Sequence, residues 1–258
     1  MEILGPTLTR IAKEKAGIVK PGVPHLIGLL PARAKAVMQS VCRKQGAPLY
    51  RLNQRRFAIR RNQLVMNYRS SHFKYDNLAP SLIGQHQLRN CALALDAATI
   101  LKERGLRIST ANALRGLHDT KWPGRFQIIK KIGEPTVILD VGHNAGGVRA
   151  FVESFRLKFP DRRATIIAGF VKLKQHQEMF DSLSSISRWY ALVPLNTKRS
   201  SDVKELLHTV DFRGIPVRPF SSVAAAYDNV LKLSEPDDIV VVIGSHYMVG
   251  AFMKWKRI

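Results

Sequence analysis

The sequence predicts an α/β fold built from two domains, residues 1–120 and 121–258. The 258 residues are enough for one or two domains, and 45% hydrophobic and 23% charged residues are typical of a globular chain. A polar stretch from His118 to Arg125 contains Trp122-Pro123-Gly124 and indicates a linker. After this linker, apolar strands alternate with amphipathic helices, which predicts a parallel sheet covered on both faces.

The first domain is expected to contain four helices and several short strands. Apolar residues at helical spacing predict helices over 8–16, 34–45, 88–104 and 109–117, with glycines closing the first three and Ser109 capping the last. Short apolar runs predict strands over 25–30, 48–52, 57–60 and 63–68, the last two joined by a tight turn at Arg61-Asn62.

The second domain is expected to contain four strands, at 136–140, 164–170, 189–193 and 239–244. Helices are expected near 145–158, 175–187, 202–210, 222–233 and 246–255. In parallel sheets of this kind, ligands bind at the carboxyl ends of the strands. Polar residues at those ends are therefore the candidate site.

The charge suggests an anionic partner but does not identify it. The formal net charge is +22, and residues 15–75 contain 13 basic and no acidic side chains. Such a surface suits nucleic acid or an anionic substrate. No nucleic-acid motif accompanies the charge, so nucleic acid is the less favoured alternative. No apolar run approaches the roughly 20 residues of a membrane span, and two cysteines make no disulfide framework, so a cytoplasmic location is expected.

Four places carry residues suited to nucleotide chemistry. Asp140 ends a strand, where an acid can accept hydrogen bonds from ribose hydroxyls. His143 precedes a helix, and a helix start favours anions. Arg125 in the linker offers a fork of donors for phosphate. Asn90 opens a long helix and could read an adenine edge. Lys15 lies near a helix end. Each residue alone is equally compatible with an ordinary capping or surface role.

Six blocks in order resemble one family. They are Leu4–Leu8, Glu14–Gly22, Gly84–Asn90, Trp122–Phe126, Ile138–Asn144 and Gly244–Gly250. Together they resemble folylpolyglutamate synthase and dihydrofolate synthase, which are ATP-dependent amide ligases of the Mur ligase superfamily. The resemblance implies the distal part of a Mur-ligase-type central ATPase domain, followed by a Rossmann-like C-terminal ligase domain.

The resemblance also implies an activity and a set of residue roles. The implied reaction adds L-glutamate to dihydropteroate or folate through an acyl phosphate, with ATP and Mg²⁺. By resemblance, Lys15 becomes carbamylated and binds Mg²⁺, Asn90 meets the adenine, and Arg125 reaches the ATP phosphates. Asp140 then contacts the ribose, and His143 contacts the nucleotide side of the closed state.

The sequence departs from the family in its phosphate loop. The family opens with a Gly-Lys-Ser/Thr loop, and none of the 17 glycines here is followed by Lys. The chain is therefore expected to correspond to the second part of the enzyme. Two interpretations follow: a separate chain carries the loop, or these residues are a silent remnant of the enzyme. The DNA sequence directly upstream would discriminate between them. Leu173-Lys174-Gln175 also stands where the family often has Asp-Lys-Asp. The family's counterpart of Gly244–Gly250 reads Gly-Ser-Leu-Tyr-Leu-Val-Gly.

Overall fold

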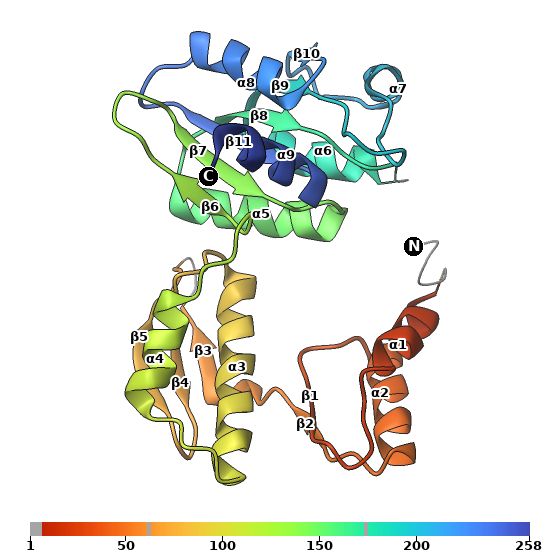
Figure 1. Ribbon diagram of the computed structural model, residues 1–258, viewed down its shortest axis with the longest axis vertical. Helices are drawn as coiled ribbons and strands as arrows, with labels where there is room; N and C mark the ends of the chain where they lie inside the picture. The colour runs from red at the N-terminus through yellow and green to blue at the C-terminus, as the bar shows by residue number, and fades with distance from the viewer. Residues whose placement is uncertain (1–6, 61–62, 173–174) are drawn as a thin grey trace. The chain divides into compact units, whose positions relative to one another are not determined.

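The computed structural model describes residues 7–60, 63–172 and 175–258 (Figure 1). They divide into two compact units. Unit 1 takes its described residues from 7–60, 65–80 and 88–118, and unit 2 from 63–64, 81–87, 119–172 and 175–258. The segment 81–87, expected in the first domain, belongs to unit 2.

Unit 1 contains two separate small sheets. Strands β1 (His25–Ile27) and β2 (Leu49–Arg51) pair in parallel, beside helices α1 (Leu8–Ala16) and α2 (Ala32–Lys44). Strands β3 (Phe57–Ile59), β4 (Met66–Arg69) and β5 (Lys74–Leu78) form an antiparallel sheet. This sheet packs on α3 (Gln85–Glu103) and α4 (Thr110–Asp119) through a shared apolar cluster.

The helices of unit 1 agree with the sequence prediction, but its strands agree less well. The first expected strand ends at Ile27, because the chain turns into α2 soon afterwards. Strand β5 was not predicted: only Tyr75 and Leu78 of it are buried, and its Asp and Asn residues disfavour strands. The expected turn at Arg61-Asn62 lies outside the described residues.

Unit 2 contains a six-stranded sheet in the order β10-β9-β8-β11-β7-β6. Its strands are β6 (Gln127–Ile129), β7 (Thr136–Asp140), β8 (Ala164–Ala168), β9 (Ser187–Leu192), β10 (Val217–Pro219) and β11 (Ile239–Ile243). All neighbouring pairs are parallel except β6 with β7. The four predicted strands are confirmed. The two that prediction missed, β6 and β10, are three-residue strands at the sheet edges and only partly buried.

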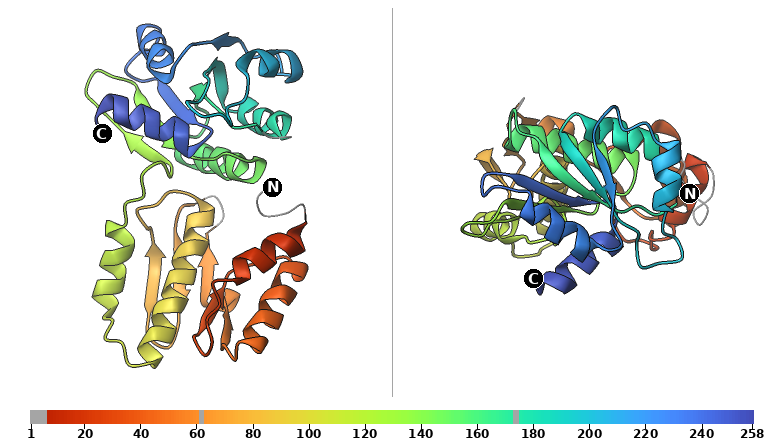
Figure 2. Two further views of the ribbon diagram at one scale, coloured as in Figure 1. Left: turned by 45° about the vertical axis from the view of Figure 1, so that its right-hand side comes forward. Right: turned by 90° about the horizontal axis from the view of Figure 1, so that it is seen from above.

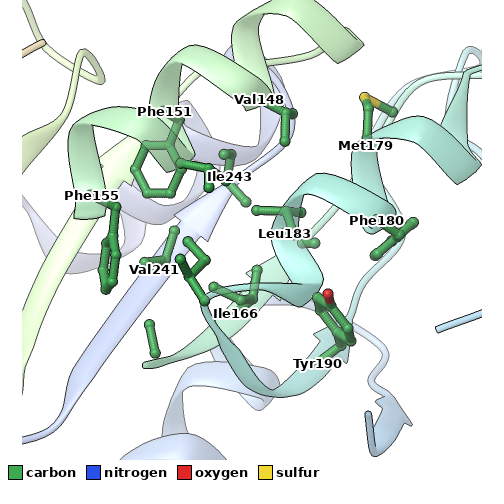
Figure 3. Packing of buried hydrophobic residues seen from close by; sticks show 14 of the residues in the cluster. Val148, Phe151, Phe155, Ile166, Met179, Phe180, Leu183, Tyr190, Val241 and Ile243 are labelled. Atoms are coloured by element: carbon green, nitrogen blue, oxygen red, sulfur yellow. The ribbon is translucent and has the colours of Figure 1, made fainter. Parts of the chain in front are cut away.

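Five helices cover the two faces of this sheet (Figures 1 and 2). They are α5 (Ala145–Lys158), α6 (His176–Ser184), α7 (Val203–Thr209), α8 (Val223–Lys232) and α9 (His246–Lys256). Phe151 and Leu183 pack over Ile166 on one face (Figure 3), whereas Tyr227 and Phe252 pack with Val240 and Val242 on the other. This two-faced burial explains why the central strands are apolar without alternation. In the part of the chain that is described, no helix is long and apolar enough to cross a membrane.

The strands β8 and β11 come into backbone contact where they end. Gly244 has φ +129°, and a Cβ built there would lie 2.2 Å from the carbonyl oxygen of Gly169. The amide of Gly169 donates to the carbonyl of Ile243 at 3.2 Å. Only glycine fits this approach, which fixes how the chain leaves β11 toward α9.

We predict that Gly244→Ala lowers the free energy of unfolding of the chain by about 2 kcal/mol or more, because it combines backbone strain with a clash. The matched control is Gly250→Ala in the exposed middle of α9, where an added Cβ meets nothing within 4 Å. That change should leave stability unchanged or raise it by about 0.5–1 kcal/mol. Urea unfolding followed by near-ultraviolet circular dichroism measures both. Equal effects of the two substitutions would contradict this reading of the strand ends.

Candidate functional site

The candidate site lies at the carboxyl ends of two neighbouring strands of unit 2. Strands β7 and β11 are in register, with Ile243 opposite Asp140, so the loops that follow them leave the same edge of the sheet. Each loop leads directly into a helix. The side chain of Asn144 caps α5 by accepting from the Gly147 amide at 2.8 Å, and the Ser245 hydroxyl caps α9 by accepting from the Met248 amide at 3.0 Å.

Asp140 joins the linker to the end of β7. Its side chain is buried, with the residue 8% exposed. One carboxylate oxygen, Oδ1, accepts from the Gly142 amide at 2.7 Å, and Oδ2 accepts from the Phe126 amide at 3.0 Å. The Val141 amide donates to the carbonyl of Gly124 at 2.9 Å, which adds a second tie between the same two segments.

Gly124 is required at this junction. Its φ is +70°, and a Cβ there would lie 2.8 Å from Cγ1 of Val141. The linker therefore crosses the end of β7 in close backbone contact. This path places the next residue, Arg125, at the carboxyl edge of the sheet.

Burial raises the pKa of Asp140 to about 6. The amide hydrogen bonds from Gly142 and Phe126, together with the positive charges of Arg125 and His143, oppose this rise. Because the folded-state pKa lies above the ordinary value of 3.8, the native state binds this proton more tightly than the unfolded chain does. The contribution of Asp140 to stability therefore falls as the pH rises from about 4 to about 6.

Two exposed basic side chains, Arg125 and His143, lie near this buried acid, and both also lie near a third, His246; we call these three residues the basic rim. The rings of His143 and His246 have centroids 6.2 Å apart. Nδ1 of His143 lies 3.0 Å from the carbonyl oxygen of Val141, which assigns the proton to Nδ1 and leaves Nε2 available to a ligand. None of the ion pairs among the described residues involves a residue of the basic rim.

The basic rim also affects the titration of His246. Partial burial lowers the pKa of His246, and the positive charge of Arg125 and the neighbouring His143 lower it further. The rim thus collects positive charge and hydrogen-bond donors without a neutralising acid at its surface. Such an arrangement suits an anionic ligand.

The structure brings together three of the five site residues predicted from the sequence: Arg125, Asp140 and His143. Lys15 and Asn90 belong to unit 1. Lys15 is exposed in the last turn of α1, and Asn90 is exposed near the start of α3, a helix whose first three residues belong to unit 2. No group of three or more His, Cys, Asp or Glu side chains in the described ranges could hold a metal ion. Leu173 and Lys174 lie outside those ranges.

Two features of the site were not recognised in the sequence. The first is that Asp140 is buried and holds the linker, which depends on a contact with Phe126, 14 residues away. The second is His246. The sequence did contain a sign of this residue, because the corresponding block of the resembling family has leucine where this chain has His246.

Comparisons with known proteins show what this chain is similar to. Residues 124–246 match the family model described as Mur ligase, glutamate ligase domain. The dihydrofolate synthase/folylpolyglutamate synthase of Bacillus subtilis is 28% identical over 98% of this chain and 59% of its own length. The protein of the same name from Escherichia coli is 30% identical over 97% of this chain and 56% of its own length.

Solved structures agree as well. The E. coli FolC structure in complex with DHPP and ADP has a TM-score of 0.79 at 27% identity, over 99% of this chain and 58% of that one. Mycobacterium tuberculosis folylpolyglutamate synthase, complexed with ADP and AMPPCP, has a TM-score of 0.83 at 23% identity, over 99% of this chain and 61% of that one. At this identity, the similarity establishes a shared fold only.

This chain spans about three fifths of the length of these relatives. The matches confirm the predicted α/β architecture, with a Mur-ligase-type first part and a Rossmann-like ligase domain. The chain is therefore similar, along nearly its whole length, to the folylpolyglutamate and dihydrofolate synthases, and residues 124–246 match the glutamate ligase domain of the Mur ligases.

Proposed function

We propose that this chain acts in the ATP-dependent addition of L-glutamate to a dihydropteroate or folate carboxylate. The observation that carries the proposal is the basic rim beside Asp140, at the carboxyl edge of a domain matched to the Mur glutamate ligases. The names of the relatives support the acceptor and the added amino acid. ADP in the solved E. coli structure supports the nucleotide.

In the proposed reaction, ATP supplies the phosphoryl group that activates the substrate carboxylate. The glutamate amine then attacks the acyl carbon, and phosphate leaves as the amide forms. Charge builds on phosphoryl oxygens in both steps, so fixed positive groups lower the barrier. The Arg125 guanidinium offers a planar fork of donors for two such oxygens. His143 offers a third contact, because Nε2 of its imidazolium form donates a hydrogen bond while Nδ1 faces the carbonyl of Val141.

The residues present fit the nucleotide at its phosphate end. The first turn of the 14-residue helix α5 adds backbone donors beside Arg125 and His143, and anions favour such a helix start. Asn90 would read the adenine, as the resemblance implies. Each carboxylate oxygen of Asp140 already accepts a hydrogen bond from one backbone amide. A ribose hydroxyl would therefore have to donate an additional hydrogen bond to the same carboxylate.

Magnesium would depend on few protein ligands here. Mg²⁺ is commonly held by one or two carboxylates together with substrate phosphates, so a site with few acids remains compatible with it. A carbamate on Lys15 would supply the hard oxygen that an ammonium lacks. The exposed position of Lys15 leaves its amine open to that modification.

In a second candidate function, these residues are one part of a two-part ligase, because no Gly-Lys-Ser/Thr loop is among them. We predict that these 258 residues alone incorporate no radiolabelled glutamate into dihydropteroate or tetrahydrofolate with ATP and Mg²⁺, since the phosphates lack their cradle. Supplying the segment encoded directly upstream, if it carries that loop, should produce incorporation. Incorporation by the 258 residues alone would show that the loop is dispensable, whereas failure of both glutamate incorporation and nucleotide binding would contradict the proposed function.

Arg125 gives a direct test of the phosphate end. We predict that Arg125→Ala weakens binding of Mg-AMPPNP to the chain by about tenfold or more, the size of a lost charged hydrogen-bond pair. Arg125→Lys should recover little of this affinity, because a lysine cannot form the fork. The matched control is Arg163→Ala, an exposed arginine of the loop before β8. Isothermal titration calorimetry measures all four proteins. Equal affinities would show that Arg125 is an ordinary surface residue.

A further inference from the structure

His246 is the member of the basic rim that the proposed function leaves without a role. It is the first residue of α9, and its exposed ring lies beside that of His143. The positive charge of Arg125 also acts on it. Three basic groups therefore converge from three segments: the linker, the loop after β7 and the start of α9.

The titratable groups on the elements next to His246 show which of them can act on its charge. Strand β11, which leads into α9, contains only Ile and Val. Helix α8, which packs against α9, carries Tyr227, Asp228 and Lys232, but Tyr227 contacts Phe252 and Trp255, at the other end of α9. Tyr247, Lys254 and Lys256 are the other titratable groups on α9 itself. Asp140 is buried and already accepts two amides. The groups that act on His246 are therefore Arg125 and His143.

The basic rim without a ligand disfavours a third positive charge. Arg125 carries a positive charge and His143 is close by, so protonation of His246 adds repulsion, and none of the ion pairs among the described residues relieves it. An anion placed against the rim reverses this effect, since its charge favours the imidazolium over the imidazole. Binding of the anion and uptake of the proton must then reinforce each other equally.

We propose that His246 takes up a proton from solvent when an anionic phosphoryl group binds beside Arg125 and His143, and that it thereby makes affinity for the phosphoryl ligand increase as the pH falls. The proposal rests on the proposed function for the nucleotide source of that group. Inorganic pyrophosphate carries the same chemistry without a nucleoside. With a leucine at this position, as in the resembling family block, Arg125 and His143 would still bind the anion, but residue 246 would gain no proton.

The test is calorimetric titration of the 258-residue chain with ADP and, separately, with pyrophosphate. Titrations at pH 7 in two buffers of different ionisation enthalpy count the protons taken up per ligand bound. The variants are His246→Leu and, as the matched control, His208→Leu, an exposed histidine near the end of α7. Because phosphate groups themselves titrate near pH 6, the quantity compared is the difference between each variant and the wild type.

We expect the wild type and His208→Leu to take up more protons per ADP than His246→Leu does. Between pH 8 and pH 6 their affinities should rise about threefold to tenfold more than that of His246→Leu, since a shift of one pKa unit corresponds to a factor of ten. His246-dependent uptake with pyrophosphate, without tighter binding of ADP, would support the inference and contradict the nucleotide function. ADP binding with equal proton uptake in all three proteins would overturn the inference and leave the function standing. Failure of both ligands to bind at millimolar concentration would overturn both.

Discussion

The buried carboxylate of Asp140 is the interaction on which the site depends. It accepts hydrogen bonds from amides of two segments, the linker at Phe126 and the loop after β7 at Gly142. A buried carboxylate is stable only when such donors satisfy it, and removing it would leave two buried amides unpaired. The same contact that stabilises the acid therefore fixes the linker across the end of β7 and places Arg125 at the edge of the sheet.

The electrostatics of the basic rim follow from this arrangement. Asp140 is buried and its carboxylate accepts hydrogen bonds from two backbone amides, whereas Arg125, His143 and His246 are exposed. Burial raises the pKa of Asp140 and lowers that of His246, so it favours the uncharged form of each side chain. The free site is thus short of negative charge, which is the condition under which an incoming phosphoryl group gains most from binding.

The sequence allowed the helices and the buried strands to be predicted, because helical spacing and unbroken apolar runs are local signals. Strands β5, β6 and β10 were missed, since short edge or polar strands depend on pairing with residues distant in sequence. In the site, Arg125, Asp140 and His143 were candidates from their residue types and positions, and the resemblance to a family supplied their expected roles. Predicting the burial of Asp140 would have required its contact with Phe126, and predicting the place of His246 would have required the register of β11 with β7. The roles of Lys15 and Asn90 stay predictions.

The most direct measurement of this account is an NMR pH titration of the backbone amides of Phe126 and Gly142. If Asp140 is buried and accepts both hydrogen bonds, both amide signals should follow one titration with a midpoint near 6, well above the ordinary carboxyl pKa of 3.8. The step should vanish from both signals in Asp140→Asn. Midpoints near 3.8, or two amides that titrate independently of each other and of Asp140, would show a solvated carboxylate and contradict the claim that this acid holds the linker in place.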